Sequence, residues 1–216
     1  MAAAGRVDVE RAIHRVLAEE PGARRLRRFV VDCPRGRSMD LTDCGRCPDC
    51  RGYTLRNVEG STIVCSLPAD EAPRGATAGT VGAAMARDVM CAAAELPLGA
   101  ALELLADQRQ RGVPVIDHAD RPIGVLYPSD VVAAVRARGF AVPAALDGAG
   151  PQRPFDPAWI PEEVRKVPVR EVMTRGALTA RETDPLDDVR ARVAGERGQR
   201  LMVVDAEGRT IGAMPA

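Results

Sequence analysis

Aromatic residues are scarce in this sequence and make up only 3% of its 216 positions. A core with so few rings must be filled mainly by alanine, valine, leucine and isoleucine, and few side chains can stack on nucleotide bases. The chain also lacks an excess of either charge, because its 30 basic and 30 acidic residues cancel. This balance offers no general attraction to nucleic acid or to anionic lipid.

Lysine and histidine are equally rare, with Lys166 the only lysine and His14 and His118 the only histidines. Nearly all basic residues are therefore arginines, and this general bias weakens the meaning of any local arginine cluster. So few histidines leave no histidine-based catalytic or metal site. Adjacent carboxylates such as Asp187 and Asp188 point apart, so we interpret them as surface residues and not as a catalytic pair. The sequence thus predicts a protein without enzymatic activity.

No signal peptide or apolar run long enough to cross a membrane is recognisable in the sequence. We therefore expect a cytoplasmic protein, whose thiols are kept reduced. Five of the six cysteines fall between Cys33 and Cys65. In a reducing compartment such crowding favours metal binding over disulfides.

An internal repeat organises the second half of the chain. At an offset of 88 residues, segment 81–101 aligns without a gap with 169–189, and 113–126 aligns with 201–214. Chance seldom places so many identities in one frame, so we infer a duplication. The identical pairs are Val81/Val169, Met85/Met173, Arg87/Arg175, Pro97/Pro185, Leu98/Leu186, Val115/Val203, Asp117/Asp205, Arg121/Arg209, Ile123/Ile211 and Gly124/Gly212.

Each copy predicts a β-α-β-β-α unit. The helix begins near Pro97 or Pro185, where the missing N–H is not needed, and short β-branched runs predict a hairpin after it. The first copy adds a second helix that Ser129 or Asp130 can cap, whereas the sequence ends at Ala216 before such a helix in the second copy. One copy cannot bury its own sheet, but two copies packed face to face can. The predicted fold class is therefore α+β.

The motifs of this repeat resemble those of a tandem pair of CBS domains, also called a Bateman module. They are the V-x-x-x-M start, the P-L helix start, G-V-P-V-I-D and R-P-I-G-V-L-Y-P-S-D. The resemblance covers residues 78–216 and implies two repeats, 78–139 and 167–216, packed about a pseudo-twofold axis. A proline-rich linker over 140–166 joins them, and the second repeat lacks its final helix.

The resemblance also implies a ligand that contains adenosine, such as AMP, ATP or S-adenosylmethionine, in a cleft between the copies. In the family pattern a carboxylate binds the ribose, and a nearby hydroxyl helps to hold phosphate. Here Asp130 supplies the carboxylate, Tyr127 replaces the expected serine or threonine, and the second copy has neither group. The alternative role of Asp130 is that of a helix cap, which needs no ligand. The expected ligand-binding residues are Asp130, Ser129, Gly124, Tyr127, Cys91 and Val113.

A missing final helix would leave part of the second sheet uncovered. Because exposed apolar surface favours association, this predicts a homodimer in which a neighbouring copy covers the sheet.

The N-terminal third is expected to contain a helix within 1–27, because apolar residues over Val7–Leu17 follow helical spacing. Residues 28–68 hold the cysteine cluster. Its C-x2-C step, with flanking strands at 29–31 and in a hairpin of 53–56 with 61–64, resembles a zinc ribbon. The expected Zn²⁺ ligands are Cys33, Cys44, Cys47 and Cys65, with Cys50 as a substitute.

Other interpretations of the N-terminal third stay open. The C-x2-C-x2-C spacing of Cys44, Cys47 and Cys50 also fits the start of an iron–sulfur site, and a third alternative is a segment without a stable metal. The arginine run Arg24–Arg28 could contact phosphates, but only Phe29 and Tyr53 could stack on bases, which argues against nucleic acid.

Three functions follow from these patterns. The first is a regulatory protein whose CBS pair binds an adenosine nucleotide and shifts its conformation or its dimer contacts. The second is a metal- or redox-responsive adaptor in which the CBS pair only dimerises. The third is nucleic-acid binding through the N-terminal segment that is rich in arginine and cysteine.

Overall fold

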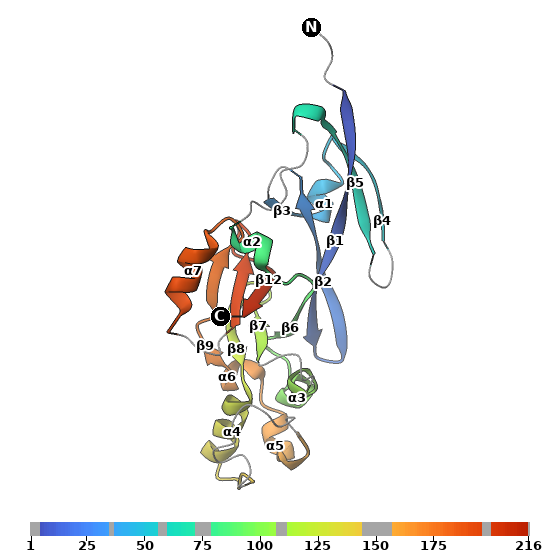
Figure 1. Cartoon of the computed structure of the whole chain (residues 1–216). Coiled ribbons are helices and arrows are strands. Elements are labelled where there is room, and N and C mark those ends of the chain that lie inside the picture. Colours follow the sequence, from blue (N-terminus) through green and yellow to red (C-terminus); the bar gives the residue numbers. More distant parts are fainter. Residues whose placement is uncertain are drawn as a thin grey trace.

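The computed structural model describes residues 5–34, 37–55, 60–71, 79–106, 112–143, 157–195 and 200–215. The strands within residues 6–68, here called the N-terminal sheet, lie at one end of the molecule, and two αβ repeats lie at the other (Figure 1). In the described residues these strands form one nine-stranded sheet with strands that follow them in the chain, and a separate three-stranded sheet belongs to the second repeat. The long strand β1 (Arg6–Glu20) runs from the N-terminal sheet to the repeats. Within the expected linker, residues 144–156 lie outside the described part of the chain.

The first part of the chain is built of strands, so the helix expected within 1–27 is wrong. β1 is followed by β2 (Ala23–Cys33), and the two form an antiparallel hairpin. β1 buries Ile13 in one apolar cluster and Val16 in another, and side chains three positions apart lie on opposite faces of a strand. This change of buried face produced an apolar spacing that resembles a helix. Pairing with distant strands decides in favour of the extended form.

The N-terminal sheet has an apolar core of its own. The first half of β1 pairs with β5 (Thr62–Pro68), and the second half pairs with β2 and, in parallel, with β6 (Val89–Ala93). β4 and β5 form the hairpin predicted near residues 53–64. The core of the N-terminal sheet contains Ile13, Val31, Leu41 and Ile63. The other elements are β3 (Arg37–Asp40), α1 (Leu41–Cys44), β4 (Cys50–Thr54) and the short 3-10 helix η1 (Ala69–Glu71).

The two repeats follow a common order of elements, except that the described residues of the first include a final helix and those of the second include one additional short strand. The first contains α2 (Val81–Ala84), β6, α3 (Leu98–Ala106), β7 (Val113–Ile116), β8 (Pro122–Leu126) and α4 (Pro128–Ala137). The segment before the second contains η3 (Pro157–Trp159) and α5 (Glu162–Arg165). The second contains α6 (Val169–Val172), β9 (Thr174–Arg175), β10 (Leu178–Arg181), α7 (Leu186–Val193), β11 (Arg200–Val204) and β12 (Thr210–Pro215).

In each repeat the first short helix is followed by a lead-in segment, residues 85–88 or 173–176, that pairs with the hairpin of the other repeat. Thr174 in β9 pairs with Val125 in β8. Ala86 and Ala213 exchange two backbone hydrogen bonds, 2.8 and 3.0 Å long. Because both members of one pair lie 88 positions from their counterparts in the other pair, the exchange is reciprocal. The two repeats are therefore related by a pseudo-twofold axis.

Two glycines make this exchange feasible. A Cβ atom built on Gly124 would lie 2.4 Å from the carbonyl oxygen of Thr174. A Cβ atom built on Gly212 would lie 2.6 Å from Met85 Sδ and 3.0 Å from the carbonyl oxygen of Ala86. Only a residue without a side chain allows the lead-in segment to approach so closely.

The sheet of the second repeat is well covered, which corrects the expectation of an exposed face. Its apolar side chains, including Leu201 at 1% and Ile211 at 2% exposure, are buried. Val16 of β1 and Val30 of β2 belong to the same apolar cluster. The N-terminal hairpin thus packs against the second repeat. This removes the reason given for a homodimer, although the dimer itself stays a prediction.

We expect Gly124→Ala to lower the free energy of unfolding by about 1–3 kcal/mol, because the added methyl group forces apart β8 and β9. Urea denaturation measures the change. Gly195→Ala is the control, since a Cβ there meets no atom within 4 Å. Equal stability of the two variants would contradict the close approach.

Candidate functional site

Asp130 lies where the two repeats meet, in the first turn of α4. Its Oδ2 accepts hydrogen bonds from the backbone N–H groups of Tyr127 (2.9 Å) and Thr174 (3.1 Å). Its Oδ1 accepts a 2.8 Å hydrogen bond from the Thr174 hydroxyl. The carboxylate therefore caps its own helix and also holds the lead-in segment of the second repeat.

Tyr127 forms a second link between the repeats. Its ring covers Gly112, where a Cβ atom would lie 2.7 Å from two ring carbons. Its hydroxyl oxygen accepts a 3.3 Å hydrogen bond from the backbone N–H of Arg200 in β11. Burial raises the pKa of Tyr127 and lowers the pKa of Arg200. Tyr127 thus joins the end of β8 to the second repeat rather than offering a free hydroxyl.

The other expected ligand-binding residues are dispersed. Gly124 lies beside Thr174, and Ser129 is exposed in the first turn of α4. Cys91 is completely buried among residues of both sheets, and this burial raises its pKa to about 12. Val113 is completely buried in the core of the first repeat. Asp130, Tyr127 and Gly124 therefore meet at the junction of the repeats, whereas Cys91 and Val113 are core residues.

Two residues at this junction, Thr174 and Arg200, were not among the expected ligand-binding residues. Thr174 occupies the position equivalent to Ala86 in the other copy. A polar residue in one copy where the other has alanine is a signal that the alignment of the repeats contained. Arg200 corresponds to Gly112 at the same offset but lies just outside the aligned segments, and its guanidinium donates a 3.4 Å hydrogen bond to the carbonyl oxygen of Gly112.

The cysteine cluster does not form a recognisable metal site. In the part of the chain that the structure describes, no group of three or more cysteine, histidine or acidic side chains is arranged to hold a metal ion. The zinc-ribbon interpretation and its ligands Cys33, Cys44, Cys47, Cys65 and substitute Cys50 therefore gain no support. A zinc ribbon folds around its metal ion with almost no apolar core, but Cys44 and Cys65 pack inside the apolar core of the N-terminal sheet.

The environment of these thiols is apolar. Burial raises the pKa of Cys44 to about 12, and the neighbouring cysteine thiols add to the effect. Burial also raises the pKa of Cys65. Both thiols are therefore protonated at neutral pH.

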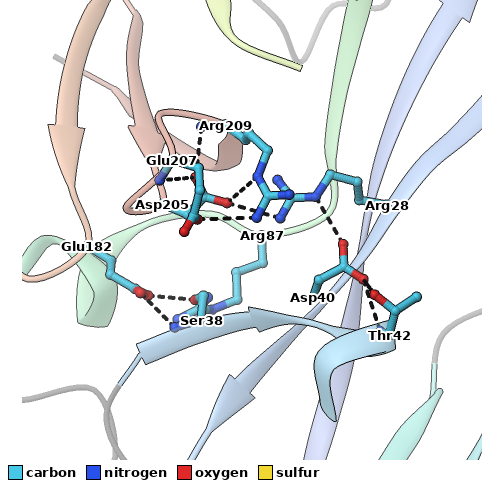
Figure 2. A network of polar contacts seen from close by, with 9 residues as sticks. All are labelled: Arg28, Ser38, Asp40, Thr42, Arg87, Glu182, Asp205, Glu207 and Arg209. Atoms are coloured by element: carbon cyan, nitrogen blue, oxygen red, sulfur yellow. Dashed lines mark hydrogen bonds and ion pairs between the residues drawn. The ribbon is translucent and has the colours of Figure 1, made fainter. Parts of the chain in front are cut away.

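Ionic contacts connect the N-terminal sheet to the second repeat (Figure 2). Arg28 of β2 donates to Asp205 at 3.0 Å and to Asp40 at 3.2 Å. The side chains of Arg28 and Asp205 are each only 6% exposed. Burial opposes the ionisation of Asp40, but hydrogen bonds from Thr42 and Arg28 outweigh it and lower its pKa. Asp205, which also pairs with Arg209 at 2.9 Å, lies in the turn between β11 and β12.

A second set of contacts involves β3 and the first lead-in segment. The N–H and hydroxyl groups of Ser38 donate to the Glu182 carboxylate at 2.6 and 2.5 Å. Arg87 forms an ion pair with Asp32 of β2 at 2.5 Å. The N-terminal sheet therefore touches both repeats through charged groups. We call the contacts of Arg28, Ser38 and Arg87 with Asp205, Glu182 and Asp32 the ionic junction.

The arginine run considered for nucleic acid is largely neutralised. Arg24 pairs with Glu19 at 2.9 Å, and Arg27 pairs with Asp120 at 2.7 Å. Arg25 pairs with Glu20 at 3.2 Å. These pairs reduce the attraction of the run for phosphate.

Comparison with known proteins identifies the repeats. Residues 81–137 and 169–213 match the CBS domain family, so the chain carries a tandem pair of CBS domains. Aligned solved structures include the CBS-pair protein CBSX2 from Arabidopsis thaliana, at 26% identity and a TM-score of 0.49, covering 64% of this chain and 89% of that chain. A comparison with curated proteins gave no match.

Two further alignments are with ligand complexes. CBSX2 in complex with AMP aligns at 25% identity and a TM-score of 0.46, covering 63% of this chain and 89% of that chain. The CBS domain pair of protein MJ0100, in complex with 5′-methylthioadenosine and S-adenosyl-L-methionine, aligns at 18% identity and a TM-score of 0.45, covering 63% and 92%. Separately, none of the helices in the described residues has the length and apolar character needed to cross a bilayer.

We expect Asp205→Ala to lower the free energy of unfolding by about 1–3 kcal/mol, because the buried Arg28 loses one of its two carboxylate partners and keeps only Asp40. The matched control is Glu207→Ala, which removes the exposed partner of Arg209 and should change stability by less than about 0.5 kcal/mol. Chemical denaturation of both variants measures the difference. A loss in Asp205→Ala as small as in the control would show that the ionic junction is dispensable.

Proposed function

We propose, on the premise of the tandem CBS pair, that this protein is a non-enzymatic regulator that binds an adenosine-containing ligand where the two repeats meet. The observation that carries the proposal is the Asp130 carboxylate, which lies between α4 and the lead-in segment of the second repeat. A carboxylate is a strong acceptor for the two adjacent hydroxyl groups of a ribose.

The ribose must compete with Thr174 for Asp130. Both carboxylate oxygens already accept hydrogen bonds, and the Thr174 hydroxyl at 2.8 Å contributes one of them. A ribose hydroxyl that takes this oxygen releases the Thr174 side chain. Ligand binding would then loosen one contact between the repeats and favour a different relative arrangement of them.

The ionic junction offers a route from the repeats to the N-terminal sheet. Asp205 and Glu182 belong to the second repeat and contact Arg28 and Ser38 of the N-terminal sheet. A displacement of the second repeat would therefore change the contacts of Arg28 in β2 and Ser38 in β3. In this proposal the CBS pair is the sensor, and the N-terminal sheet is the part whose contacts change.

A cytoplasmic location and a homodimer complete the proposal, and light scattering of the purified protein tests the dimer.

Isothermal titration with AMP, ATP and S-adenosylmethionine tests the proposed site. Asp130→Asn should weaken binding about tenfold, because it removes the charge that the ribose hydroxyls address. Thr174→Val should tighten binding about two- to tenfold, because it removes a competing donor. Asp187→Asn is the matched control and should bind as the parent protein does, since the Asp187 side chain is 97% exposed on α7.

The outcomes separate the parts of the proposal. Absence of heat with all three ligands, in a protein that is folded by circular dichroism, would disprove nucleotide sensing. Equal weakening by Asp130→Asn and Thr174→Val would show that Thr174 contacts the ligand. In that case the site stands, but the competition between Thr174 and the ribose is wrong.

A further inference from the structure

Cys50 and Cys65 lie directly opposite each other on the antiparallel strands β4 and β5. They do not exchange backbone hydrogen bonds, because the N–H of Cys50 donates to the carbonyl oxygen of Cys47 at 3.1 Å. The N–H of Ser66 instead donates to the carbonyl oxygen of Asp49 at 2.8 Å, one position outside the pair. This pattern defines a non-hydrogen-bonded pair, whose Cα atoms are about 4.5 Å apart. Disulfides span Cα distances of about 4.4–6.8 Å, so the pair is within reach.

The two thiols also face the same side of the sheet. Cys65, at 8% exposure, belongs to the apolar core of the N-terminal sheet, and the half-buried Cys50 packs against that core. The irregularity of β4 falls after Cys50, where Arg51 is the extra residue before Gly52 pairs with Val64. The register at the cysteine pair is therefore undisturbed.

We propose that Cys50 and Cys65 form a reversible disulfide, which makes this hairpin a site of oxidative modification. The more exposed Cys50 reacts first with a peroxide: its sulfur bonds to one peroxide oxygen, the O–O bond breaks, and one water leaves. The Cys65 sulfur then bonds to the Cys50 sulfur, and the S–O bond breaks to release a second water. The two thiols together lose two electrons and two protons, and the peroxide is reduced to two water molecules. A thiol reductant reverses the reaction.

The position of β4 gives the disulfide a consequence. Among the described strands, β4 pairs only with β5, so it is held at the sheet edge by one ladder. A covalent link at its first residue would prevent β4 from separating from β5. This inference does not rest on nucleotide binding, because the hairpin lies outside the CBS repeats.

Peptide mapping of the full-length protein tests the proposal. The protein is treated with hydrogen peroxide, its remaining thiols are alkylated, and trypsin digestion is followed by mass spectrometry. Cleavage after Arg46, Arg51 and Arg56 places Cys50 and Cys65 on different peptides, but it leaves Cys47 with Cys50. The Cys47→Ser variant therefore identifies which of these two is linked. We expect a cross-linked product two hydrogens lighter than the separate peptides, and we expect dithiothreitol to abolish it.

Matched variants and a metal measurement complete the test. Cys50→Ser should abolish the cross-link, whereas Cys33→Ser, which changes another half-buried cysteine, should keep it. Oxidation should also slow amide hydrogen exchange along β4 in the parent protein. A cross-link that survives in Cys50→Ser, a main product that joins other cysteines, or no product at all would overturn the proposal. So would stoichiometric zinc in the purified protein that blocks the reaction, because the thiols would then be metal ligands.

Discussion

The fold depends on the reciprocal pairing in which each repeat supplies a strand segment to the hairpin of the other. The outer strand of each hairpin finds its pairing partner in the other repeat. Ala86 pairs with the hairpin of the second repeat, and Thr174 pairs with the hairpin of the first. Gly124 and Gly212 permit this approach because any side chain there would collide with the incoming segment. The same pairing places Thr174 beside α4. The reciprocal pairing of the repeats therefore also places Asp130 between them.

The N-terminal sheet and the repeats share both backbone and side-chain contacts. β1 joins β6 in a parallel ladder, while Val16 and Val30 enter the core of the second repeat. The buried pair of Arg28 and Asp205 adds directional contact to this apolar packing. A buried ion pair gives little net stability over an apolar pair of the same shape. We therefore interpret its role as fixing one orientation of the N-terminal sheet.

The duplication was predictable because the same local sequence motifs occur twice, at a constant offset and without gaps. Identical pairs such as Pro97/Pro185 and Gly124/Gly212 marked the helix starts and the hairpins. The N-terminal sheet was harder to foresee, because β1 changes its buried face between Ile13 and Val16. The site was predictable only in part. Asp130 belongs to a recognisable motif, but Arg200 reaches the junction solely through tertiary packing.

The length of β1 has a mechanical consequence. Residues near Glu19 are embedded beside β6, while Val9 pairs with Cys65 at the far end of the same continuous strand. The ten residue steps from Val9 to Glu19 span roughly 33 Å at about 3.3 Å each. A tilt of about 5° at the embedded end would move the far end by roughly 3 Å over that span. The strand thus acts as a lever arm, so a small rotation of the CBS repeats becomes a larger displacement near the cysteine cluster.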